Sequence, residues 1–315
     1  MCGIVGFFDK AGGAAPVGAA VLAMLSALGC RGPDSAGIAW WGDDADGLVV
    51  RVKPGDDGDS TARRREIAKR ASALGRVRVS PAGGSLLRLE IAKADPADLA
   101  RAIEAVGSDV EVVSMGRRLE IVKQTGAPLS LERDFGISRV TGSHALGHTR
   151  LSTESRVDLS HSQPFWAHGY PDLAIVHNGH ITNYHRLRRL YEQEGVRFYT
   201  ENDSEIIGVY LARKLAAGAS LAEALQDSVR ELDGSFSYLA ATGEAFGFAK
   251  DPFCLKPLIV AETDGTVAIT NEEIALASAL PAGYQAREAG ASAVAVWQRP
   301  IVAPRRRASR GGEAA

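Results

Sequence analysis

Short apolar segments alternate with helical segments from Ala145 to about Pro300, and this order constrains the fold more than any other feature. Strands are predicted, from length and from β-branched and aromatic content, at 172–177, 236–241, 245–250, 258–261 and 267–270. Helices are predicted, from the spacing of apolar residues, at 183–194, 203–217 and 221–232. Because short strands in hairpin order pack as antiparallel sheets covered by helices, we expect an α+β domain built in layers.

The N-terminal part opens with a strand that begins at residue two. The run Cys2–Phe8 is apolar and rich in β-branched and aromatic residues, and a turn of Asp-Lys-Ala-Gly-Gly closes it. Apolar residues at helical spacing predict a helix at 17–28, and a second strand is predicted at 36–41. The expected order is strand, helix, strand.

The character of the chain changes between about residues 48 and 136. An Arg- and Lys-rich helix is predicted at 62–74, a strand at 85–92, and a second helix that Asp95 caps and Pro96 begins. Two further strands, at 110–113 and 119–122, are predicted to form a hairpin. This αβαββ order predicts a small α/β insert within a domain of residues 1–303. Residues 304–315 lack apolar periodicity, so we expect a disordered tail.

Composition argues against several classes of function. The 315 residues (33.3 kDa) are 45% hydrophobic with a net charge of −2, and the basic run at 305–307 gives no footprint for nucleic acid. The apolar runs end well short of the roughly 20 residues that span a bilayer. Three cysteines without a C-x-x-C pair fit neither a disulfide framework nor a zinc site. With no recognisable signal peptide, we expect a reduced, cytoplasmic protein without nucleic-acid or membrane partners.

Cys2 stands between the initiator methionine and Gly3. Removal of the methionine would give Cys2 a free α-amino group, whose pKa of about 7.7–8.0 lies near that of the thiol, about 8.5. The amine can then take the thiol proton and later donate a proton to a leaving amine, while Gly3 would let a substrate come close. One interpretation is therefore a terminal nucleophile. The other is that Cys2 is a small buried hydrophobic residue on an edge strand.

Five blocks of sequence resemble one known family. They are the segments 2–7 (CGIVGF), 31–37 (RGPDSAG), 147–153 (GHTRLST), 177–183 (HNGHITN) and 202–205 (NDSE). They follow the order of the class II glutamine amidotransferases, which are N-terminal-nucleophile hydrolases with a four-layer αββα sandwich. Within that family the chain is most similar to the stand-alone amidotransferase subunits of glutamate-synthase-like proteins, including that of N-methylglutamate synthase. The resemblance implies an αββα sandwich interrupted by the α/β insert.

The resemblance also implies three residues that bind glutamine. Arg150 would hold the α-carboxylate, because a guanidinium fork suits planar, bidentate recognition. Thr153 would add a hydroxyl donor, and Asp203 would accept from the substrate ammonium. The alternatives are that Arg150 is a structural arginine at a strand end and that Asp203 is a plain helix N-cap. Leu151 stands where the family often has an aromatic residue, and Glu154 stands where some members have a histidine.

By the same resemblance, Asn178 and Gly179 would form an oxyanion hole from an amide side chain and a backbone N–H. The alternative is a tight turn, because Asn-Gly is a common turn dipeptide. Arg31 resembles the family arginine near the nucleophile strand and would have a supporting role. The several histidines show no metal-ligand spacing, so we interpret them as sheet and loop residues.

The resemblance implies a glutaminase that forms a γ-glutamyl thioester on Cys2, releases ammonia and hydrolyses the thioester to glutamate. No metal and no organic cofactor is expected. The ammonia acceptor would lie on another polypeptide, so we expect a subunit of a hetero-oligomer with a synthase partner. The alternatives are a stand-alone amidohydrolase of γ-glutamyl or other amides and a non-catalytic glutamine-sensing subunit. The insert is expected to bind the partner or another copy of the chain, unless it merely covers an edge of the sandwich.

Overall fold

A computed structural model describes residues 2–56, 60–80, 83–151 and 157–300. The predicted tail at 304–315 lies outside these residues. Within the described ranges, no helix combines the length and the apolar character that crossing a membrane requires.

Two antiparallel sheets form the body of the molecule. The first has seven strands in the order β15 (Ala286–Glu288), β13 (Ile259–Glu262), β14 (Thr266–Thr270), β1 (Gly3–Asp9), β8 (His144–Arg150), β2 (Ser35–Trp41) and β7 (Leu119–Thr125). The second has five, in the order β16 (Val294–Gln298), β12 (Ala245–Lys250), β11 (Gly234–Ala241), β10 (Ala174–Ile181) and β9 (Phe165–Trp166). Strand β1, predicted from the opening run of the sequence, lies near the middle of the first sheet.

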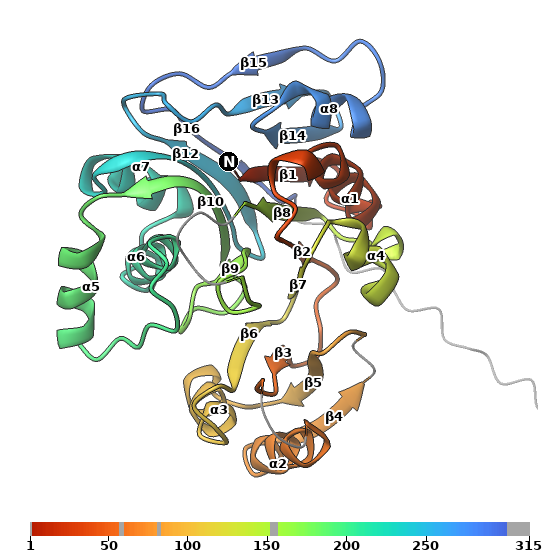
Figure 1. Cartoon of the computed structure of the whole chain (residues 1–315), viewed down its shortest axis with the longest axis vertical. Helices are drawn as coiled ribbons and strands as arrows, with labels where there is room; N and C mark the ends of the chain where they lie inside the picture. Colours follow the sequence, from red (N-terminus) through yellow and green to blue (C-terminus); the bar gives the residue numbers. More distant parts are fainter. Residues whose placement is uncertain (1, 57–59, 81–82, 152–156, 301–315) are drawn as a thin grey trace, which may run out of the picture.

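Helices cover the outer faces of both sheets (Figure 1). On the seven-stranded sheet lie α1 (Val17–Ala27), α8 (Glu273–Ala279) and α4 (Leu129–Phe135), with short 3-10 turns at Gly29–Arg31 and Ile137–Arg139. On the five-stranded sheet lie α6 (Ser204–Ala216) and α7 (Leu221–Glu231), and α5 (Tyr184–Gln193) packs against α6. The expected α+β fold, a four-layer αββα sandwich, is confirmed.

The apolar side chains form two cores. The first lies between the two sheets and continues under α1 and α8 and into the insert, and the second lies between the five-stranded sheet and its helices. Along β10, Val176 belongs to the first core and its neighbour Ile175 to the second, because successive strand residues point to opposite faces. An uninterrupted apolar run places apolar side chains on both faces of its strand, so both faces have to be buried. The two cores together hold the ends of β1, β8 and β10 in fixed positions relative to one another.

The insert forms a third, four-stranded sheet below the sandwich in Figure 1. Its strands lie in the order β4 (Arg76–Ser80), β5 (Leu87–Ala92), β3 (Leu48–Lys53) and β6 (Glu111–Gly116), beside α2 (Ser60–Ser72) and α3 (Pro96–Glu104). The predicted cap is confirmed, since the Asp95 carboxylate accepts from the backbone N–H groups of Ala97 and Asp98, both at 3.0 Å. The edge strand β4 was not predicted.

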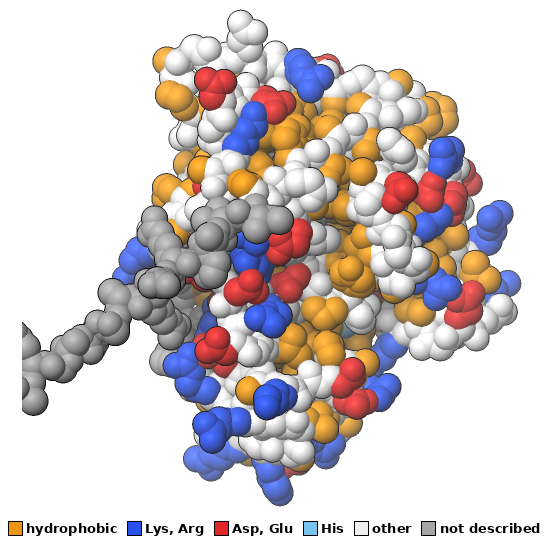
Figure 2. All heavy atoms as spheres, turned by 180° about the vertical axis from the view of Figure 1, so that it is seen from behind, with side chains coloured by type: hydrophobic (Ala, Val, Ile, Leu, Met, Phe, Trp, Pro, Cys, Tyr) orange, Lys and Arg blue, Asp and Glu red, His pale blue; other side chains and the backbone are white. Residues whose placement is uncertain are grey.

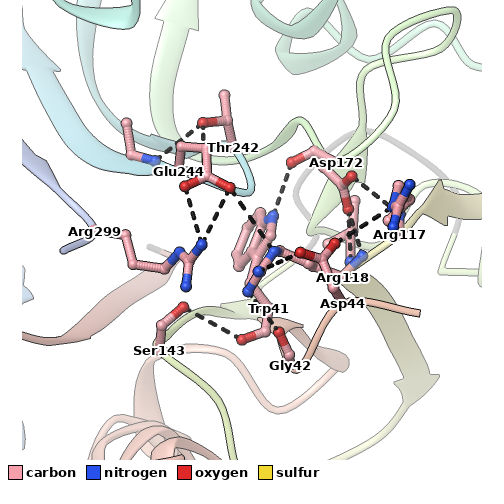
Figure 3. Close-up of polar contacts among 12 residues, drawn as sticks. Trp41, Gly42, Asp44, Arg117, Arg118, Ser143, Asp172, Thr242, Glu244 and Arg299 are labelled. Atoms are coloured by element: carbon pink, nitrogen blue, oxygen red, sulfur yellow. Dashed lines mark hydrogen bonds and ion pairs between the residues drawn. The ribbon is translucent and has the colours of Figure 1, made fainter. Parts of the chain in front are cut away.

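The predicted hairpin at 110–122 is wrong. Strand β6 pairs with β3 in the insert, whereas β7 pairs with β2 in the seven-stranded sheet. The link between them is held by Asp172, which accepts from the backbone N–H groups of Arg117, Arg118 and Leu119 at 2.8–3.0 Å (Figure 3). These bonds replace a hairpin turn and lead the chain from one sheet into the other. The sheet of the insert thus spans residues 48–116. The segment 119–135, which the sequence analysis had included in the insert, packs on the sandwich instead.

Candidate active site

Cys2 lies directly before β1 and is half-buried. Its carbonyl oxygen accepts from the side-chain amide of Asn178 at 3.4 Å and from that of Asn271 at 3.3 Å. The Asn271 Oδ1 atom in turn accepts from the backbone N–H of Ile4 at 2.9 Å. The N-terminal segment is therefore held from both sheets, by Asn178 on β10 and by Asn271 directly after β14.

Sequence reasoning missed Asn271. The sole signal for it was its position just after the predicted strand at 267–270. Its neighbour Glu272 forms an ion pair with Arg31. Within the described ranges, the Nε and Nη2 atoms of Arg31 are buried and make no hydrogen bond. Arg31 therefore binds the segment that holds Cys2, which is compatible with the supporting role expected for it.

Gly3 is packed against the side chains of Thr149 and Leu28 on the side where a Cβ atom would project. Such an atom would lie 2.7 Å from Cγ2 of Thr149 and 3.0 Å from Cδ1 of Leu28. Real Cβ atoms do not approach so closely, so glycine is needed for packing at this point. This packing by itself requires a glycine after Cys2.

Asn178 and Gly179 lie inside strand β10, opposite Ser237 and Phe236 of β11. The alternative of a tight turn is therefore wrong. Gly179 has a φ of +143°, and a Cβ there would lie 2.2 Å from the carbonyl oxygen of Ser235. Glycine is needed because both the backbone conformation and the neighbouring strand exclude a side chain. Asn178 is buried and points its amide at Cys2.

Arg150 ends strand β8 and is only 5% exposed. Its carbonyl oxygen accepts from the N–H of Asp34 at 3.0 Å, and a Cβ on Gly32 would lie 2.5 Å from its nitrogen. The segment that begins at Arg31 is thus packed closely against the end of β8. Leu151, the next residue, is partly exposed. Thr153 and Glu154 lie outside the described residues.

Asp203 precedes helix α6, but its side chain does not cap the helix. Its Oδ2 atom accepts from the backbone N–H of Ile181 at 2.7 Å and lies 3.5 Å from Nδ1 of His180. The cap-like bond is made by Asn202, whose Oδ1 accepts from the N–H of Ser204 at 3.0 Å. The alternative that Asp203 is a plain N-cap is therefore wrong. Asp203 therefore lies beside Ile181, the last residue of β10, which is two residues after Gly179.

Two buried histidines flank this end of the sandwich. Burial, followed by the charge of Arg150, lowers the pKa of His148 to about 3. Burial likewise lowers the pKa of His177, whose Nδ1 lies 2.8 Å from Oγ of Ser204. Both rings are therefore neutral near pH 7 and are poor candidates for proton transfer. In the described part of the chain, no group of three His, Cys, Asp or Glu side chains could hold a metal ion.

The chain is similar in sequence to known glutamine amidotransferases. A family model described as a glutamine amidotransferase domain matches residues 148–278. A putative glutamine amidotransferase of Methanothermobacter thermautotrophicus is 38% identical over 88% of this chain and 93% of its own length. The glutamine amidotransferase-like protein GlxB of Rhizobium meliloti is 36% identical over 88% of this chain and 91% of its own length.

A solved structure shows the same fold. Glutamine phosphoribosylpyrophosphate amidotransferase from B. subtilis superposes with a TM-score of 0.59 at 18% identity, over 96% of this chain. The chain spans 50% of the length of that protein. The chain belongs to the glutamine amidotransferases, and the resemblance to class II of that family is confirmed. It is an enzyme whose family uses glutamine.

Proposed function

We propose that this chain hydrolyses the side-chain amide of L-glutamine, with Cys2 as the nucleophile, and supplies the ammonia to a separate synthase subunit of the glutamate-synthase or N-methylglutamate-synthase type. The observation that carries the proposal is the hydrogen bond between Asn178 and the carbonyl of Cys2, two residues far apart in sequence. Gly179 on the same strand and Arg150 and Asp203 at neighbouring element ends supply the remaining groups. The free cysteines suit a reducing, cytoplasmic setting.

The reaction follows from these groups. The α-amine of Cys2 takes the thiol proton, and the sulfur attacks the amide carbon of glutamine. The negative oxygen of the tetrahedral intermediate accepts from the Asn178 side chain and the Gly179 N–H. The carbon–nitrogen bond breaks as the ammonium of Cys2 returns its proton, and ammonia leaves. Water then attacks the thioester, releasing glutamate and the thiol.

Three residues would bind the other end of the substrate. Arg150 would pair with the α-carboxylate of glutamine, and its burial strengthens such a pair because little water competes for the guanidinium. Thr153 would add a hydroxyl donor. Asp203 would accept from the substrate ammonium, with the oxygen that does not accept from Ile181.

The test uses Cys2 itself. Cys2→Ala should abolish glutamine hydrolysis without changing the unfolding midpoint, and Cys2→Ser should leave little activity, because a hydroxyl is a poorer nucleophile near pH 7. Intact mass should show that active protein begins at Cys2 with a free amine. Hydrolysis by Cys2→Ala at the wild-type rate, or a retained Met1 in active protein, would refute the assignment. Faster turnover of other amides than of glutamine would favour the stand-alone amidohydrolase.

A basic surface on the insert supports a partner. Lys and Arg side chains gather at the lower end of the molecule in Figure 2. Helix α2 and edge strand β4 carry seven of them and one acidic residue, Glu66. An acidic surface of the synthase subunit would complement this face. The alternatives are that the insert binds a second copy of the chain or that it only covers the edge of the sandwich.

Glutamine hydrolysis by the isolated chain should be slow and should become faster when the partner is added. The double variant Arg65→Glu, Arg76→Glu should weaken the complex, and added salt should weaken the wild-type complex. An unchanged complex would place the contact elsewhere.

A further inference from the structure

A buried carboxylate of the insert reaches across to the sandwich. Glu104, in the last turn of α3, is 7% exposed, and its Oε1 atom accepts from the N–H of Val112 at 3.2 Å. Its Oε2 atom accepts from the hydroxyl of Tyr199 at 2.6 Å. Tyr199 belongs to the segment between α5 and α6. The ring of His168 stacks on the ring of Tyr199, with the ring centroids 3.9 Å apart. We call this contact the Glu104–Tyr199 bond.

The segment that carries Tyr199 is tied to the first turn of α6. The buried carboxylate of Glu205 accepts from the backbone N–H groups of Tyr199 and Thr200 at 2.8 and 3.0 Å. It also accepts from the Thr200 hydroxyl at 2.9 Å. Because Glu205 is two residues after Asp203, the Tyr199 side chain and the Asp203 backbone belong to one hydrogen-bonded unit. A displacement of Tyr199 would therefore reach Asp203 through Glu205.

A second contact joins the insert to a segment that is hydrogen-bonded to the same turn. Lys53, the last residue of β3, donates to the Ser160 hydroxyl at 3.2 Å. In the same segment, the amide of Gln163 donates to Oγ of Ser204 at 3.1 Å and accepts from the N–H of His177 at 2.6 Å. Buried Lys123 of β7 also holds this segment through the carbonyl of Ser162 at 3.0 Å. Both contacts from the insert thus end in segments that are themselves hydrogen-bonded to the first turn of α6, which follows Asp203.

We propose that the insert positions the glutamine-binding part of the site and that Glu104 and Tyr199 are positioning residues for Asp203. The proposal rests on the proposed role of Asp203 in binding the substrate ammonium. Cys2, Asn178 and Asn271 make none of these bonds themselves. The Gln163 bond to His177, beside Asn178, is separate from the Glu104–Tyr199 bond. Loss of the Glu104–Tyr199 bond should therefore weaken glutamine binding while the chemical step proceeds at its normal rate.

The matched variants are Tyr199→Phe and Tyr238→Phe. Each removes one hydroxyl that makes a short hydrogen bond, to Glu104 in the first case and to Ser228, inside the core under α7, in the second. Tyr199→Phe should raise KM for glutamine about tenfold, as expected for a lost bond to a charged acceptor, with kcat within about twofold. Tyr238→Phe should leave KM unchanged. Equal KM values for the two variants, or a fall in kcat as large as the rise in KM, would overturn the proposal.

A second pair of variants tests the bond itself. Glu104→Gln keeps one acceptor oxygen, so its KM should rise less than that of Tyr199→Phe. Because both residues act through one bond, the double variant should have the KM of Tyr199→Phe alone. A KM equal to the product of the two single effects would show that the residues act independently and would refute the assignment.

Amide hydrogen exchange tests the positioning without glutamine. In Tyr199→Phe, the amides of residues 199–205 should exchange about tenfold faster, while those of β1 stay protected. If the wild-type chain hydrolyses no glutamine, the proposed function fails and exchange alone decides whether the insert orders this segment. If the wild type is active but exchange or KM is unchanged in Tyr199→Phe, only the positioning proposal fails.

Discussion

Arg150 and Asn178 reach the candidate site from different sheets, so their roles can be separated by mutation. Arg150 lies at the end of β8 and would contact the part of glutamine that does not react. Asn178 lies within β10 and points at Cys2, where the oxyanion would form. A group that binds substrate and transition state equally affects KM, whereas a group that binds the transition state alone affects kcat.

Arg150→Lys should therefore raise KM for glutamine strongly, because an ammonium replaces a bidentate fork with a point charge. Asn178→Ala should lower kcat by roughly 10²- to 10³-fold, as for other oxyanion donors. Steady-state kinetics with glutamine give both parameters, and unfolding midpoints control for loss of structure. If both variants changed KM alone, the division of roles between Arg150 and Asn178 would be wrong.

At the residue scale, sequence motifs identified Asn178, which contacts Cys2, but not Asn271, which also holds the Cys2 carbonyl. Asn178 could be named because it lies in a motif next to a predicted strand. Asn271 could not, because its contact with Cys2 exists only once β14 pairs with β1. The alternative of a turn at Asn178 failed for a similar reason, since both residues of the dipeptide pair with β11 as part of a strand.

At the element scale, the link between β6 and β7 shows where local pattern is insufficient. Two apolar runs separated by a short polar segment indicate a hairpin. Here each strand pairs with another partner, and Asp172, distant in sequence, accepts the three N–H groups of the link. Strand β4 was missed because its alternating Arg and Val residues suit an exposed edge strand, without a buried face to mark it.

Asp172→Asn should destabilise the fold by roughly 2 kcal/mol, because it replaces one of two charged acceptor oxygens with a donor that faces a backbone N–H. Asparagine also tolerates the positive φ of this position, +62°, so backbone strain is not added. Urea midpoints measure the change. Asp44→Asn is the matched control, since Asp44 is half-exposed and pairs with Arg118 in the same cluster (Figure 3). A loss no greater than that of the control would show that Asp172 does not hold the link.

For the whole molecule, the sequence predicted the layered sandwich but gave the insert a role in partner binding or in covering an edge of the sandwich, and none at the site. Glu104 and Lys53 look like surface residues in sequence, because charged side chains are rarely buried. Their burial and their contacts with Tyr199 and Ser160 follow from the way the insert packs on the sandwich. A Gly/Ser replacement of the insert should therefore impair glutamine binding as well as any partner contact.

The buried histidines give the whole fold a dependence on pH. His144 is fully buried, stacks on Trp41 with ring centroids 4.5 Å apart, and lies 2.8 Å from the carbonyl of Thr242. Burial, followed by the charges of Arg299 and Arg118, lowers its pKa to about 3. In the unfolded chain its pKa is about 6.5. The unfolded state therefore binds a proton that the folded state excludes, and stability is full above about pH 6.5 and falls below it.

Between pH 7.5 and 5.5, His144 alone should thus remove about 1.4 kcal/mol of stability. In His144→Gln the side-chain amide can still donate to Thr242 but does not titrate. The variant should be less stable than wild type at pH 7.5, and the difference should shrink by about 1.4 kcal/mol at pH 5.5. Because all other titrating groups are shared, their contributions cancel in the comparison. Urea unfolding at the two pH values gives the difference, and parallel losses in both proteins would mean that His144 is protonated in the folded state.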